Sequence, residues 1–165
     1  MGDPRRFDVF ARNLYYKFPP DKYRNVLVVA DGNLELSKRL VTYGYSVTAV
    51  EPKPRLKNVS NMFLKKIRLI KRWFTREDTI KGINLVIGMH PDEATVEILH
   101  YAKINEVAFA VVPCCILGDI HYTVHCHKHK DWIDRLKRIN RNSVTEVLNI
   151  AGKNVMVYSG TGTNY

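Results

Sequence analysis

Short apolar runs without polar alternation recur along the chain and predict buried strands. The clearest lie at 26–29, 83–88 and 107–112, and several of their residues are β-branched. Such runs are typical of strands that are covered on both faces, as in a parallel sheet. Between them, the segments 34–43 and 95–101 place their apolar residues at helical spacing, so strands and helices are predicted to alternate.

The remaining segments carry patterns of their own. Residues 1–24 form a lead-in, in which a short amphipathic helix through Phe7 and Leu14 ends before Pro19. The small, polar tail at 159–165 is predicted to be loose. The other predicted elements are a strand at 46–50, a short helix at 59–66, a strand at 67–74 with Trp73 in the core, a helix at 132–139, and strands at 144–150 and 154–158.

The order of these elements defines a fold class. Alternating strands and helices predict a mostly parallel sheet with right-handed crossovers, and the last two strands flank Gly152 as an antiparallel hairpin. We therefore expect one α/β domain over 1–165, a three-layer Rossmann-like sandwich of about seven strands. No apolar run reaches the roughly 18 residues of a membrane-spanning helix, and no signal peptide is expected.

The first predicted strand leads into a turn with the chemistry of a nucleotide site. Asp31-Gly32-Asn33 breaks the strand, and Gly32 is expected to supply a positive φ and a close approach to the backbone. The first N–H groups of the following helix would point at a ligand above the turn. Glu51 ends the next strand, where a carboxylate can accept hydrogen bonds from two ribose hydroxyls. An ordinary strand-to-helix turn and a surface carboxylate are the alternatives.

Two later strand ends carry further candidate side chains. Since the carboxyl ends of parallel strands meet at one edge of the sheet, these should lie near the first turn. His90 is a candidate base because imidazole titrates near neutrality, whereas Asp92 or Glu93 could instead cap the next helix. The cysteines are expected to line the pocket. The two segments are His90-Pro91-Asp92-Glu93 and Pro113-Cys114-Cys115.

The loop at 117–130 is dense in potential metal ligands. Zinc needs four N or S ligands, and Cys114 or Cys115 could join Cys126 and two histidines of the loop. The spacing matches no common zinc motif, so no metal site is predicted. A loop whose imidazoles contact substrate bases and a plain solvated loop remain open. The loop carries His121, His125, Cys126, His127 and His129.

Charge adds an anionic partner to this picture. The net charge is +10, and the segment 53–81 holds ten Lys and Arg residues against two acidic ones. With Phe63, Trp73 and Phe74 interleaved, this segment can supply phosphate contacts and stacking, so RNA is the favoured partner. A generally basic surface is the alternative. An odd number of cysteines, three, favours reduced thiols and an intracellular protein, cytoplasmic or nuclear.

Three motifs carry a family resemblance. Residues 30–37, Ala-Asp-Gly-Asn-Leu-Glu-Leu-Ser, are similar to the G-D-G-[DN]-L-S-F-S cofactor motif of rRNA uridine methyltransferase-like proteins. Residues 88–95 together with 112–115 are similar to a G-L-H-x-D-x-A-T and V-P-C-C pair in eukaryotic methyltransferase-like proteins. With the acidic Glu51 and the terminal hairpin, residues 25–158 resemble the class I S-adenosylmethionine-dependent methyltransferase superfamily.

The resemblance implies S-adenosylmethionine as cofactor and transfer of a methyl group to RNA or another macromolecule, with no membrane partner. It implies catalytic roles for His90 and Asp92. The implied cofactor-binding residues are Asp31, Gly32, Asn33, Glu51, Gly88 and Met89, and the implied substrate or pocket-lining residues are Pro113, Cys114, Cys115 and His121.

Departures from the family pattern keep a second interpretation open. The usual G-x-G-x-G is reduced to Asp31-Gly32-Asn33. This fits a non-catalytic, Rossmann-like binding module that contacts nucleic acid or protein through its basic face. An NAD-type oxidoreductase is disfavoured, because the chain lacks G-x-G-x-x-G and its last two strands form a hairpin.

Overall fold

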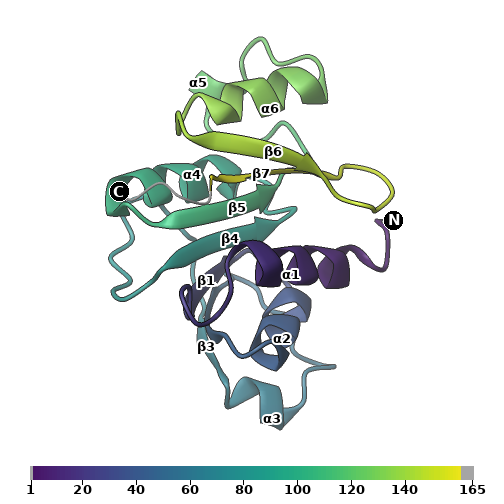
Figure 1. The fold of residues 1–165 in the computed structure, drawn as a ribbon, viewed down its shortest axis with the longest axis vertical. Coiled ribbons are helices and arrows are strands. Elements are labelled where there is room, and N and C mark those ends of the chain that lie inside the picture. The colour runs from purple at the N-terminus through teal and green to yellow at the C-terminus, as the bar shows by residue number, and fades with distance from the viewer. Residues whose placement is uncertain (1, 161–165) are drawn as a thin grey trace.

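The computed structural model describes residues 2–160, which form one seven-stranded sheet between two layers of helices (Figure 1). The strand order is β3-β2-β1-β4-β5-β7-β6. Strands β1 to β5 are parallel, whereas β7 runs antiparallel to β5 and β6. The Rossmann-like sandwich with its terminal hairpin is therefore confirmed. The elements are α1 (Arg6–Lys17), β1 (Asn25–Val29), α2 (Glu35–Thr42), β2 (Ser46–Val50), α3 (Asn61–Leu64), β3 (Ile67–Ile70), β4 (Leu85–Met89), α4 (Ala94–Asn105), β5 (Ala108–Val112), α5 (Ile120–Thr123), α6 (His129–Lys137), β6 (Ser143–Val147) and β7 (Val155–Ser159).

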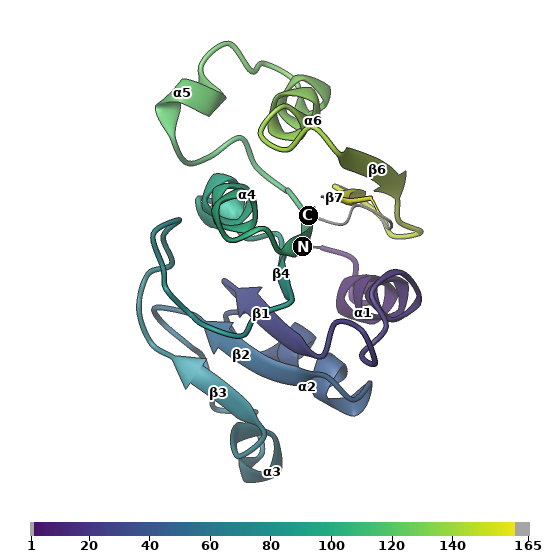
Figure 2. The same cartoon turned by 60° about the vertical axis from the view of Figure 1, so that its left-hand side comes forward.

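Alternate residues of each central strand pack against opposite helix layers. Val26 and Val28 of β1 belong to the core that includes α1 and α2, whereas Leu27 and Val29 belong to the core that includes α4 and α6. Figure 2 shows α1 and α4 on opposite sides of the sheet. Because helices cover both faces, apolar side chains are needed at every position of these strands, which explains the uninterrupted apolar runs.

β3 is shorter than predicted, and Trp73 is not a core residue. The partner strand β2 ends at Val50, since Pro52 has no N–H to donate, and the chain beyond Ile70 therefore has no strand to pair with. Trp73 is 66% exposed, whereas the next residue, Phe74, is only 7% exposed and enters the core. The aromatic pair thus straddles the boundary between core and surface.

Two further predictions need correction. The segment 117–130 is not all loop, because it contains α5 and the first residues of α6. Ser159, predicted in the loose tail, ends β7 and is buried, and its Oγ accepts a hydrogen bond from the Phe109 N–H. The rest of that tail, 161–165, lies outside the described residues. Within 2–160, no helix is both long and apolar enough to cross a membrane.

Gly88 marks the closest approach of α4 to the sheet. A Cβ atom at this position would lie 2.7 Å from Ile98 Cδ1 and 2.8 Å from Pro91 Cβ. Carbon atoms in favourable contact are about 3.5–4.0 Å apart, so even a methyl group does not fit. The missing side chain therefore lets α4, and the loop that precedes it, pack directly on β4.

Gly88→Ala should destabilise the protein by about 1–3 kcal/mol, the usual cost of overpacking a core. Urea denaturation would measure the change. The matched background is Ile98→Val, which removes the Cδ1 atom nearest to the new methyl group. In that background Gly88→Ala should cost less than in the wild type. Equal losses in the two backgrounds would contradict this account of the contact.

Candidate functional site

A cavity of about 640 Å³ opens at the carboxyl ends of the central strands. Its volume lies within the range of small-molecule pockets, about 300–1,000 Å³. It is centred where the chain, starting at β1, adds β2 and β3 on one side and β4 and β5 on the other. Open α/β sheets bind their ligands at such a switch point. The wall is formed by Arg6, Phe7, 29–33, 50–53, Arg55, Trp73, Phe74, 89–94 and Glu97.

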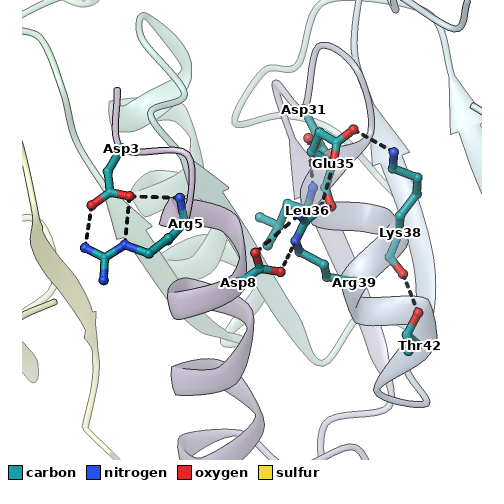
Figure 3. A network of polar contacts seen from close by, with 9 residues as sticks. All are labelled: Asp3, Arg5, Asp8, Asp31, Glu35, Leu36, Lys38, Arg39 and Thr42. Carbon is teal, nitrogen blue, oxygen red and sulfur yellow. Dashed lines mark hydrogen bonds and ion pairs between the residues drawn. The ribbon is translucent and has the colours of Figure 1, made fainter. Parts of the chain in front are cut away.

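Asp31 ties the end of β1 to the start of α2. Its Oδ2 accepts a hydrogen bond from the Ser37 N–H at 2.7 Å, and its Oδ1 accepts one from the Leu36 N–H at 3.3 Å, the latter drawn in Figure 3. N–H groups in the first turn of a helix have no partner inside the helix. Burial raises the pKa of Asp31, and these hydrogen bonds oppose the rise. The carboxylate thus faces the helix, while the residue contributes to the cavity wall.

The left-handed backbone of this turn falls on Ala30 and Leu34, each with φ of 58°, and not on Gly32 as expected. Gly32 instead makes room for Arg55: a Cβ on Gly32 would lie 3.1 Å from Arg55 Nη2. The Arg55 N–H also donates to the Gly32 carbonyl at 2.6 Å. A non-glycine residue in the left-handed region is strained by about 1–2 kcal/mol, and such strain clusters at functional sites.

Glu51 reaches the same cavity from β2. The residue is 8% exposed, and its Oε1 accepts a hydrogen bond from the Lys53 N–H at 2.8 Å. Its other oxygen, Oε2, makes no hydrogen bond within 2–160, which leaves one carboxylate oxygen for a ligand. Asn33 and Met89, both predicted to bind cofactor, also line the wall.

The N-terminal end of α1 closes one side of the cavity. Arg39 of α2 forms ion pairs with Asp8 of α1 and with Glu35, as Figure 3 shows. This link holds the first turn of α1 beside the turn after β1, where Arg6 and Phe7 join the wall.

His90 follows β4 in a left-handed conformation, with φ of 54°. Its Nε2 lies 3.0 Å from the carbonyl oxygen of Lys153. A carbonyl oxygen can only accept, so Nε2 carries the proton and Nδ1 of the neutral ring holds a lone pair. Burial lowers the pKa of His90, which favours this neutral form at pH 7.

The carboxylates after His90 do not cap α4. Glu93 stands at the N-cap position without a side-chain cap hydrogen bond. Asp92, also left-handed with φ of 47°, accepts a hydrogen bond from the Cys114 thiol, with 2.9 Å between Oδ1 and Sγ. Burial and this hydrogen bond raise the pKa of Cys114, so the thiol remains protonated at neutral pH.

Five of the predicted site residues lie outside the cavity wall. Gly88 faces α4, Pro113 is buried, and Cys115 and His121 are exposed on the far side of Asp92 from the first turn or beyond it in the chain. The fifth, Cys114, touches the wall only through Asp92.

The wall also contains residues that the sequence did not assign to the pocket. Lys53, Arg55 and Trp73 lie in the basic segment, whose charge and aromatic residues were attributed to RNA contact. Arg6 and Phe7 reach the cavity only because α1 packs beside α2, and no local pattern indicates this.

The lowered pKa of His90 has a consequence for stability. The folded protein binds a proton at His90 less readily than the unfolded chain, whose ordinary value is 6.5. Stability is therefore present above that pH and is lost as the pH falls through 6.5.

His90→Gln should flatten the decrease in unfolding free energy that urea denaturation measures between about pH 7.5 and pH 5.5. His127→Gln is the control, because His127 is exposed. An unchanged slope in His90→Gln, or the same flattening in both variants, would contradict the assignment.

Comparison with known proteins supports the fold and leaves the sequence family open. No protein-family model matches this sequence, and no curated protein matches it. Human N-acetylserotonin methyltransferase, solved with S-adenosylmethionine, is similar in structure with a TM-score of 0.63 at 12% identity, covering 94% of this chain and 53% of that one. Mitomycin 7-O-methyltransferase is similar with a TM-score of 0.59 at 10% identity, covering 92% and 52%.

A third similar structure is precorrin-6y C5,15-methyltransferase from Geobacter metallireducens, with a TM-score of 0.53 at 12% identity over 82% of this chain and 77% of that one. This chain thus spans about half the length of the first two proteins. The fold of this chain is the fold of S-adenosylmethionine-dependent methyltransferases.

Proposed function

We propose that the cavity binds S-adenosylmethionine and that the chain is a methyltransferase. The observation that carries the proposal is the unpaired Glu51 Oε2, which lies at the end of β2 in the wall that also holds the turn after β1. A carboxylate at this place can accept hydrogen bonds from the ribose hydroxyls of a nucleoside. The similar structures with bound S-adenosylmethionine support the choice of nucleoside.

Other wall residues match the remaining parts of this cofactor. Trp73 and Phe74 offer aromatic surface for an adenine ring. Arg55 places a guanidinium group beside Gly32, where the carboxylate of an amino-acid moiety would find a cation. Asp31 keeps the start of α2 in place, so the cofactor would meet a turn that is already formed.

S-adenosylmethionine would supply an electrophilic methyl group attached to a sulfonium sulfur. The contribution of the chain is to position an acceptor and to remove its proton. His90 is suited to that step, since its Nε2 proton is held by the Lys153 carbonyl and its Nδ1 is unprotonated. Asp92, in the same wall, is available to orient the acceptor.

For the acceptor we propose RNA. Ten cations occupy 53–81, and two of them form ion pairs: Arg72 with Asp78, and Arg76 with Glu97 and Asp119. The other eight are exposed and form no ion pair within 2–160: Lys53, Arg55, Lys57, Lys65, Lys66, Arg68, Lys71 and Lys81.

These cations extend from the cavity to the opposite end of the sheet. Lys53 and Arg55 belong to the cavity wall, whereas Lys65, Lys66 and Arg68 line a second hollow, of about 460 Å³, at the amino ends of β1, β2 and β3. A strip of positive charge that leads into a candidate active site suits a phosphate backbone with one nucleotide in the cavity.

Isothermal calorimetry with S-adenosylhomocysteine tests the cofactor site. Wild type should bind, and Glu51→Gln should bind about tenfold more weakly, because an amide oxygen accepts less strongly than a carboxylate and its NH₂ cannot accept. Glu77→Gln is the matched control, since Glu77 is exposed in the same region but outside the wall.

Absence of binding heat at millimolar ligand would rule out the cofactor site. Binding that Glu51→Gln and Glu77→Gln weaken equally would show that the ligand does not use Glu51. RNA binding without any cofactor binding would support the non-catalytic binding module instead.

The RNA surface has its own test, a fluorescence anisotropy titration of single-stranded RNA at several salt concentrations. Replacing Lys65, Lys66 and Arg68 together by Gln removes three phosphate partners. The slope of log affinity against log salt should fall in magnitude by about 2, from roughly 0.7 per lost contact on a single strand.

The control triple variant replaces Lys22, Lys103 and Arg138 by Gln. These residues are exposed and lie outside 53–81, so the net charge changes equally while the basic strip stays intact. A control that loses as much affinity as the test variant would show that only overall charge matters, and would contradict the proposed surface.

A further inference from the structure

Three metal-ligating side chains meet beside the cavity, in a combination that the sequence analysis did not consider. One carboxylate oxygen of Asp92 and the Sγ atoms of Cys114 and Cys115 all lie within 4.8 Å of one another. Asp92 follows β4 and the two cysteines follow β5, so the group joins the ends of two neighbouring parallel strands. All three cysteines of the chain are free thiols.

The backbone holds these two loops in register. Met89 pairs with Val112 at the end of the ladder, and the His90 N–H donates to the Val112 carbonyl at 2.9 Å. Asp92 is fixed in its left-handed conformation by Thr95, whose N–H and Oγ both donate to its carbonyl oxygen, at 3.2 and 2.9 Å.

The cysteine loop is held from its other side. Pro113 is buried and restricts the backbone immediately before Cys114. The ring of His129, at the start of α6, lies with Nε2 3.0 Å from the Pro113 carbonyl oxygen, which can only accept. The three ligand side chains are thus presented by backbone that is hydrogen-bonded on both sides.

We propose that Asp92, Cys114 and Cys115 form a zinc-binding site. Two thiolates and one carboxylate form a donor set that zinc accepts, and softer thiolate ligands disfavour magnesium and calcium. Ligands around a tetrahedral zinc ion stand about 3.3–3.8 Å apart, given metal–ligand distances of about 2.0–2.3 Å. The present separations therefore need to close by about 1 Å at most, and Asp92 and Cys114 are already in contact.

The site is accessible and has an open position. Asp92 and Cys115 are exposed and Cys114 is partly buried, so an ion can enter from solvent. Three protein ligands leave the fourth tetrahedral position to water or to another group, as in zinc sites that take part in reactions. Asp92 also belongs to the cavity wall, which places the ion at the edge of the candidate active site.

The site differs from the loop-based arrangement left open by the sequence. Cys126 does not join the cluster, because its thiol donates to the Tyr122 carbonyl, with 3.4 Å between the sulfur and the oxygen. His121 is on α5, where its N–H donates to Asp119. Within 2–160, the histidines of 121–129 form no group of ligands close enough to hold one ion.

The test uses the untagged full chain, loaded with Zn²⁺, desalted and analysed for metal by mass spectrometry. Wild type should retain one zinc ion per chain. The double variant Cys114→Ser/Cys115→Ser should retain none, and Asp92→Asn should bind at least tenfold more weakly. Cys126→Ser, the matched control, should retain the same zinc as wild type.

Cobalt gives a second measurement that identifies the ligands. Co²⁺ bound through thiolates shows sulfur-to-metal charge-transfer absorption in the near ultraviolet, which histidine ligands alone do not produce. Wild type and Cys126→Ser should show this band, and the double variant should lack it while keeping its thermal unfolding midpoint in metal-free buffer. Failure of wild type to retain zinc, equal loss in Cys126→Ser, or retention in the double variant would each overturn the proposal. The result does not depend on S-adenosylhomocysteine binding, which calorimetry measures separately.

Discussion

The hydrogen bonds from the start of α2 to the Asp31 carboxylate are the interaction on which the candidate site depends. They join the last residue of a buried strand segment to the first helical turn, and thereby fix the backbone of 30–34 between them. That backbone includes two left-handed non-glycine residues, Ala30 and Leu34, which would relax without such a constraint. Burial makes the carboxylate costly to ionise, so the arrangement works only because two N–H donors meet it.

The double-sided core explains why several such loops meet at one place. Helices cover both faces of the parallel strands, so the strand ends are the only parts of the central sheet where polar side chains can gather. The turn after β1, Glu51 after β2 and the His90–Asp92 segment after β4 all lie at this edge. Left-handed residues occur in both the β1 and β4 loops, which concentrates backbone strain around the same cavity.

The fold was largely predictable because strand identity is a local property of this sequence. Runs such as 26–29 and 107–112 are too apolar for anything but a buried element, and their alternation with helical patterns fixes the sheet type. The failures came where pairing and packing decide. β3 stops at Ile70 because β2 offers no further partner, and Trp73 therefore turns outward although its composition suggested the core.

The site was predictable in part, for a related physical reason. Residues at strand ends, such as Glu51 and His90, could be placed from the topology alone. The contributions of Arg6 and Arg55 could not, since they depend on how α1 packs beside α2 and on how the loop after β2 folds over Gly32. The ligand cluster of Asp92 with Cys114 and Cys115 was also hidden, because it depends on the register between β4 and β5.

The central claim is that this cavity is an S-adenosylmethionine site organised by the turn after β1. A crystal structure of the chain with S-adenosylhomocysteine tests it most directly. The account predicts the ribose hydroxyls on Glu51 and the amino-acid moiety beside Gly32 and Arg55. Ligand bound at another place, or a cavity that stays empty at saturating ligand, would contradict it.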